Sequence, residues 1–135
     1  MSFEELEHTA DVRIRVLAKS REELFISAAN AMFGILYPGE CSIRSEKIVL
    51  VDGENAEELL WEFLSELLFI SEVESFVVCE TTVQFTKGGL TGLIRGEPFE
   101  RNRHGGGREI KGVSYSGLFI RQEGAEFNCE IIFDI

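Results

Sequence analysis

The sequence predicts an α+β domain in which a largely antiparallel sheet packs two amphipathic helices on one face. Two observations carry this prediction. Apolar side chains recur at helical spacing over residues 24–36 and 59–68, whereas short runs elsewhere are rich in β-branched and aromatic residues and predict strands. No repeat, low-complexity segment or linker interrupts the chain, so residues 1–135 are expected to form a single domain.

The first predicted strand and helix occupy the N-terminal third of the chain. Residues 12–16 alternate between aliphatic side chains and arginines, as in a half-buried strand. Ser20 then begins a capping box, because its hydroxyl can accept from the N–H of Glu23 and the Glu23 carboxylate can reach back to the N–H of Ser20. The apolar stripe of this helix consists of Leu24, Phe25, Ala28, Ala29, Met32, Phe33 and Leu36. We expect residues 38–39, Pro-Gly, to end the helix.

A second helix and a run of strands follow. A strand over residues 47–52 precedes a helix that begins at Asn55. The buried stripe of that helix consists of Leu59, Leu60, Phe63, Leu64, Leu67 and Leu68. Further strands are predicted over residues 76–85, 90–96, 113–121 and 127–133. Residues 97–109, which contain three consecutive glycines and several basic side chains, are expected to be irregular and mobile.

The cysteines give no sign of a disulfide framework. Cys41, Cys79 and Cys129 are odd in number, far apart and without a CxxC pair, which also argues against a zinc site. Cys79 and Cys129 lie in apolar strand-like runs, so both are expected to be buried free thiols.

The charge of the chain limits its partners. Thirteen basic and twenty-four acidic side chains give a formal net charge of −11, so non-specific binding of nucleic acid is not expected. The acidic N-terminus differs from a signal peptide, and no apolar run approaches the length of a membrane span. We therefore expect a cytoplasmic protein that has no contact with a membrane.

Acidic groups at the two ends of the chain predict a metal site. His8 and Asp11 precede the first strand, and Asp134 and Ile135 follow the last one. If that last strand is central, the carboxylates of Asp11, Asp134 and the Ile135 terminus repel one another unless a cation lies between them. Oxygen ligands of this kind suit Ca²⁺, Mg²⁺ or Mn²⁺. In the alternative interpretation, Thr9 and Asp11 only cap local backbone groups.

Several segments, in order along the chain, together resemble the archease family. They are His8-Thr9-Ala10-Asp11, Glu23 with Phe25 and Ala28-Ala29, residues 59–68 (LLWEFLSELL), Gly96-Glu97, His104, Ile110-Lys111 and Asp134-Ile135. The resemblance implies a protein that is not itself an enzyme but activates an RtcB-type RNA ligase in tRNA splicing or RNA repair. It implies that the ligase uses GTP and a divalent metal, and that this protein promotes guanylylation of the ligase and its multiple turnover.

The resemblance also assigns site residues. The metal site of the family corresponds to Asp11, Asp134 and Ile135, with Ca²⁺ the ion expected in crystals and Mg²⁺ or Mn²⁺ as alternatives. His8 is expected either to orient Asp11 or to be an ordinary structural histidine. The family often has a histidine where this chain has Ser116, which puts any role for an imidazole at that position in doubt.

Three further residues are candidates for lining the same end or facing the partner: Glu97, His104 and Lys111. The alternative for Glu97 and His104 is a solvated loop, and for Lys111 an outward-facing strand position.

Two other functions compete with the activator. A stand-alone metal-dependent phosphohydrolase would bind Mg²⁺ and a water nucleophile on the same carboxylates. A general chaperone-like interaction module would use the acidic surface instead. The sequence contains no GxxxxGK[ST], GxGxxG, GxSxG or HExxH motif that would favour a particular enzyme class.

Overall fold

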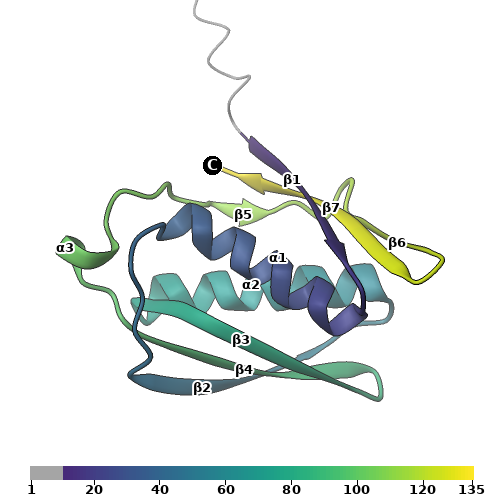
Figure 1. Ribbon diagram of the computed structural model, residues 1–135, viewed down its shortest axis with the longest axis horizontal. Helices are drawn as coiled ribbons and strands as arrows, with labels where there is room; N and C mark the ends of the chain where they lie inside the picture. The colour runs from purple at the N-terminus through teal and green to yellow at the C-terminus, as the bar shows by residue number, and fades with distance from the viewer. Residues whose placement is uncertain (1–10) are drawn as a thin grey trace, which may run out of the picture.

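The computed structural model describes residues 11–135, which form two antiparallel sheets with two long helices between them (Figure 1). Along the chain the elements are β1 (Asp11–Ala18), α1 (Arg21–Leu36), β2 (Ser45–Asp52), α2 (Ala56–Val73), β3 (Phe76–Thr86), β4 (Gly89–Pro98), α3 (Arg101–His104), β5 (Gly112–Val113), β6 (Phe119–Glu123) and β7 (Glu126–Asp134). The predicted α+β class is confirmed.

The strands divide into two sheets, and each packs one face on the helices. The four-stranded sheet has the order β1-β7-β5, with β6 also paired to β7, and the three-stranded sheet has the order β2-β4-β3. Every strand pair is antiparallel. Both α1 and α2 contact strands of both sheets, so the helices form a middle layer (Figure 1).

Side-chain caps begin both long helices where the sequence predicts them. The Ser20 hydroxyl accepts from the N–H of Glu23 at 3.1 Å, and the Asn55 side-chain oxygen accepts from the N–H of Glu58 at 2.8 Å. The two predicted apolar stripes are buried in the core, where Phe25 and Phe63 are fully enclosed. Within the described residues, no helix is long and apolar enough to cross a membrane.

The region predicted as one strand over residues 113–121 forms two separate strands. Gly117 has φ +81°, a conformation that favours glycine, and the N–H of Leu118 donates back to the carbonyl of Tyr115 at 3.2 Å. This turn separates β5 from β6, and both strands still pair with β7.

The predicted irregular segment 97–109 is held more closely than the sequence suggests. It contains the end of β4 and the short helix α3. The N–H of Arg108 donates to the carbonyl of Ile35 at 2.9 Å. A Cβ atom at Gly107 would lie only 2.0 Å from the carbonyl oxygen of Leu36, so the absence of a side chain allows this segment to lie against the end of α1.

The prediction for the cysteines is wrong for two of the three. Cys41 and Cys79 form a disulfide, with Cα atoms 5.5 Å apart, whereas Cys129 is a buried free thiol as predicted. Sequence spacing could not reveal this pair, because Cys41 lies in the α1–β2 loop and reaches β3 only through the tertiary fold.

Candidate functional site

Two of the predicted metal ligands lie opposite each other across two paired strands. Asp11 begins β1 and Asp134 ends β7, and the antiparallel register makes them direct partners. Side chains that are directly opposite in such a pair project from the same face, with Cβ atoms about 4.5–5.5 Å apart. Both residues are exposed. The fold therefore brings together two carboxylates that are more than a hundred residues apart in the sequence.

The surroundings of Asp134 hold it in a defined position. The N–H of Lys111 donates to the Asp134 carbonyl at 2.6 Å, and Gly112 pairs with Asp134 in the sheet. Trp61 of α2 supports this arrangement, because its indole N–H donates to the carbonyl of Val113 at 2.7 Å. Short strand β5 is thereby held between α2 and β7.

Ile135 and Lys111 lie at the same end of the sheet as the aspartates. The Ile135 side chain is half-buried and packs against the core, so the residue after Asp134 is anchored. Lys111 is exposed. Its position next to Asp134 agrees with a partner-facing role, which remains a prediction, and His8 lies outside the described residues.

The Asp11–Asp134 pair is chemically suited to a hard divalent cation. Like charges directly opposite in a sheet destabilise it, and among residues 11–135 no lysine, arginine or histidine forms an ion pair with either carboxylate. An all-oxygen donor set suits Ca²⁺, Mg²⁺ or Mn²⁺. A bound cation would remove the repulsion that the register imposes.

A second group of polar side chains, which we term the Glu97 cluster (Glu97, Arg103 and His104), lies elsewhere in the molecule, with Arg103 partly exposed. Glu97 at the end of β4 has no exposed surface, and His104 is 1% exposed. Arg103 of α3 forms an ion pair with the Glu97 carboxylate, which also accepts from the N–H of Ser42 at 2.6 Å. The alternative interpretation of Glu97 and His104, a solvated loop, is therefore wrong.

The hydrogen bonds of His104 define its tautomer. Its Nδ1 accepts from the N–H of Glu100 at 2.8 Å, so the proton of the neutral ring is on Nε2. That nitrogen lies 3.0 Å from a Glu97 oxygen and donates to it. His104 thus helps to hold Glu97 and to close α3 onto the end of β4.

The ionisation of Glu97 is set by these contacts. The hydrogen bond from Arg103, followed by the one from the N–H of Ser42, lowers the pKa of Glu97 from 4.5 to about 2, although burial opposes the shift. The same ion pair raises the pKa of Arg103. The Glu97 carboxylate is fully engaged and negatively charged, which makes it unsuited to act as a general base near neutral pH.

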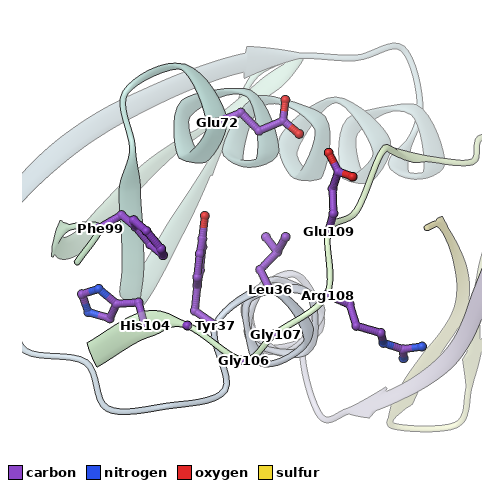
Figure 2. Close-up of a pocket in the computed structure, with 10 residues that line it drawn as sticks. Leu36, Tyr37, Glu72, Phe99, His104, Gly106, Gly107, Arg108 and Glu109 are labelled. Atoms are coloured by element: carbon purple, nitrogen blue, oxygen red, sulfur yellow. The ribbon is translucent and has the colours of Figure 1, made fainter. Parts of the chain in front are cut away.

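A surface pocket of about 390 Å³ lies beside the Glu97 cluster (Figure 2). Tyr37, Phe99 and His104 line it with their rings, and ring centroids of Phe99 and His104 are 5.8 Å apart. Figure 2 shows the side chains of Glu72 and Glu109 on the side of the pocket away from His104. The pocket is bounded by the end of α1, by α2 and by the segment around α3, and it has none of the predicted metal carboxylates in its lining.

The sequence-predicted residues therefore fall into two groups. Asp11, Lys111, Asp134 and Ile135 lie at the end of the β1–β7 pair, whereas Glu97 and His104 belong to the buried cluster. Sequence reasoning missed the role of Arg103, which was visible only as one basic residue in a glycine-rich segment. Ser42 was missed as well, because a backbone N–H carries no sequence signal.

Comparison with known proteins gives a consistent result over the whole chain. Residues 3–135 match the Archease protein family (MTH1598/TM1083). The archease-like protein of Drosophila melanogaster is 34% identical over an alignment that covers 100% of this chain and 91% of that protein. Protein archease of Methanopyrus kandleri is 30% identical, with both chains covered completely.

Solved structures agree with this assignment. The solution structure of Methanobacterium thermoautotrophicum protein 1598 has a TM-score of 0.82 and 27% identity, with 94% of each chain covered. The crystal structure of a Thermotoga maritima protein, described as an archease and possible chaperone, has a TM-score of 0.69 at 19% identity and covers 95% of this chain and 93% of that one. At that identity it supports the fold alone. Since the family match spans nearly every residue, the chain belongs to the archease family.

Proposed function

We propose that this protein is a non-enzymatic, divalent-metal-binding activator of an RtcB-type RNA ligase in the cytoplasm. In this proposal it promotes guanylylation of the ligase with GTP and so allows multiple turnover in tRNA splicing or RNA repair. The observation that carries the proposal is the cross-strand pair of Asp11 and Asp134, with Lys111 and Ile135 beside it.

The chemistry of this end supports an activator. Asp11, Asp134 and the Ile135 carboxylate are the groups proposed to hold the cation, which when bound would be available to a phosphate group of the partner's nucleotide. Lys111, whose side chain is exposed, would supply a positive charge for the same phosphate. Asp11, Asp134 and Lys111 are exposed rather than enclosed in a catalytic cleft, which suits them to binding a cation and a partner's phosphate.

The net charge of −11 supports a protein partner rather than a nucleic acid. An acidic surface does not hold RNA by its phosphates, so in this proposal the ligase alone contacts the RNA ends.

The test is RNA ligation under multiple-turnover conditions with a purified RtcB-type ligase, GTP and Mn²⁺. We compare no addition, the wild-type protein, Asp134→Asn and Asp52→Asn. Asp52 is the matched control, since it is an exposed aspartate that ends β2 just as Asp134 ends β7. Acceleration by the wild type and by Asp52→Asn, with loss in Asp134→Asn, is the expected result.

The two competing functions predict different outcomes. A phosphohydrolase would release phosphate from nucleotides or RNA ends when no ligase is present, but Glu97 is buried in an ion pair with Arg103 and is not available to it as a general base. A chaperone-like module is favoured by one observation, the outward apolar side chains of Ile48 and Leu50 on β2, which are 71% and 73% exposed. If ligation is accelerated equally by wild type and Asp134→Asn, the metal-dependent activator is excluded and the chaperone-like module becomes the better explanation.

A further inference from the structure

The disulfide between Cys41 and Cys79 lies directly next to the Glu97 cluster. Cys79 is in β3 and Cys41 is in the α1–β2 loop (residues 37–44), which has no helix or strand of its own. Ligand atoms of Cys41, Cys79 and Glu97 all lie within 4.8 Å of one another, and among the described residues this is the only group of three His, Cys, Asp or Glu side chains with that spacing.

A β-bulge presents Cys79 to the loop. The pairing of β3 with β4 shifts between Val78, which is opposite Gly96, and Glu80, which is opposite Arg95. Cys79 is the extra residue at this shift and has no partner in β4. Bulges of this kind redirect a side chain out of the regular alternation. Here the redirected side chain meets Cys41.

The loop is held in place even without the disulfide. The N–H of Ser42 donates to Glu97 at 2.6 Å, and the N–H of Arg44 donates to the Gly96 carbonyl at 2.8 Å. Arg103 donates to the Ser42 hydroxyl at 3.2 Å. The Cys79 sulfur lies 3.5 Å from the Ser42 carbonyl oxygen, which gives a reduced thiol an acceptor. A reduced Cys79 would therefore have a hydrogen-bond acceptor in a loop that other contacts already hold.

Both sulfurs are within reach of small molecules in solution. Cys41 and Cys79 line an open surface pocket together with Pro38 and Gly39. Cys129 is the opposite case, since it has no exposed surface and burial raises the pKa of its thiol to about 11. Reactivity toward oxidants follows exposure and thiolate character, so the chain contains one accessible pair and one protected thiol.

We propose that Cys41 and Cys79 form a reversible thiol–disulfide site that a peroxide closes and a dithiol reductant opens. Closure ties the α1–β2 loop covalently to β3 and restricts the motion of Ser42 against Glu97. This inference is independent of the function proposed above.

The chemistry of closure balances with hydrogen peroxide as the oxidant. The thiolate of one cysteine attacks a peroxide oxygen, the O–O bond breaks, and the departing hydroxide takes a proton to form water, which leaves a sulfenic acid. The second thiolate attacks that sulfur, the S–O bond breaks as the disulfide forms, and the departing hydroxide takes the proton that the second thiol released, giving a second water. Two electrons pass from the sulfurs to the peroxide. A dithiol reductant reverses the step by thiol–disulfide exchange.

The experiment treats the full chain with hydrogen peroxide and then counts alkylatable thiols after denaturation, by mass spectrometry. We expect three thiols in the reduced protein and one, Cys129, in the oxidised protein, with a Cys41–Cys79 cross-linked peptide that dithiothreitol removes. Cys41→Ser and Cys79→Ser should abolish the cross-link, whereas Cys129→Ser should preserve it. Because Cys41 lies in a loop whereas Cys79 lies in β3, Cys41→Ser is expected to disturb folding less than Cys79→Ser.

Formation of the disulfide should change two measurable properties, the Tm and the rate of amide hydrogen exchange. The closed loop spans 38 residues, so oxidation should raise Tm by roughly 10 °C in the wild type and in Cys129→Ser, but not in Cys41→Ser. Amide hydrogen exchange should slow in residues 37–44 and 97–104.

Three outcomes would overturn the proposal. One is the absence of the Cys41–Cys79 peptide after peroxide treatment. Another is a disulfide that dithiothreitol cannot open in the folded protein, which would make it a permanent structural bond. The last is tight stoichiometric binding of Zn²⁺ by the reduced protein that blocks oxidation, which would identify a metal site made of the same side chains.

Discussion

At the scale of single residues, the protein contains two groups of carboxylates that differ in exposure and in hydrogen-bond partners. Asp11 and Asp134 are exposed and face each other, and among residues 11–135 neither forms an ion pair with a lysine, arginine or histidine. Glu97 is buried and bound by Arg103, His104 and a backbone N–H. The first arrangement leaves oxygen atoms available for a ligand, whereas the second uses them to hold the fold together.

Replacing Asp134 by Asn should weaken divalent-metal binding at least tenfold, because one charged ligand of the proposed site is lost. Isothermal titration with Ca²⁺ and Mn²⁺ measures this directly. The control, Asp52→Asn, removes an equally exposed strand-end carboxylate and should leave the affinity unchanged. Equal affinities in both variants would mean that the metal site is elsewhere.

The Glu97 carboxylate should make stability depend on pH in the acid range. Its pKa is about 2 in the folded protein and near 4.5 when unfolded, so the unfolded state binds a proton first as the pH falls. The stabilisation is fully present above about pH 4.5 and is lost progressively as the pH falls toward 2. In Glu97→Gln, Tm should be lower at pH 7, and the decline that this group causes between pH 4.5 and 2 should disappear.

The matched control for that measurement is Glu126→Gln, at an exposed hairpin position. Its curve of Tm against pH should follow the wild type. A Glu97→Gln curve parallel to the wild type would contradict the assigned role of the ion pair.

At the scale of the secondary structure elements, two glycines with opposite surroundings test the packing of β4 and α1. A Cβ at Gly96 would lie 1.8 Å from the carbonyl oxygen of Val77, whereas a Cβ at Gly34 in α1 would meet nothing within 4 Å. Gly96→Ala should therefore lower the free energy of unfolding by more than about 2 kcal/mol. Gly34→Ala should raise it by about 0.4–1 kcal/mol, because alanine favours the helix. Chemical denaturation of both variants checks these signs.

The helices could be predicted from the sequence because their signals are local. Caps at Ser20 and Asn55 and apolar stripes at a 3.6-residue period lie within one segment each. Most strands were also predictable from their composition. The turn that separates β5 from β6 was not, because the left-handed conformation of Gly117 is a single-residue feature within an otherwise strand-like run.

The sheets and the site were only partly predictable. The division into two sheets depends on which strands pair, and that is decided by long-range packing. The pairing of Asp11 with Asp134 was expected only if the last strand was central, and β7 does pair with β1, β5 and β6. The contact of Arg103 with Glu97 and the Cys41–Cys79 bond both join a loop to a strand, and no periodic pattern reports such contacts.

At the scale of the whole molecule, the proposed metal site includes the carboxylate of Ile135 and is therefore open to a test by extension. Appending a few residues after Ile135 would convert its carboxylate into a neutral amide while the half-buried side chain can still pack against the core. We expect metal affinity to fall sharply and the rise in Tm caused by added metal to shrink, with the Tm of the metal-free protein nearly unchanged. Differential scanning fluorimetry with and without Mn²⁺ measures both quantities, and undiminished metal stabilisation would exclude the terminal carboxylate as a ligand.

The pairing of β1 with β7 also has a consequence for synthesis of the protein on the ribosome. These strands are neighbours in the sheet, yet the partners Asp11 and Asp134 are 123 positions apart, and within residues 11–135 β1 pairs with no other strand. At translation rates of about 5–20 residues per second, β1 waits roughly 6–25 s for its partner. During that interval its backbone donors and acceptors are unpaired, whereas β2, β3 and β4 can already associate. We therefore expect the sheet of β2, β4 and β3 to form on the nascent chain before Asp11 and Asp134 can pair.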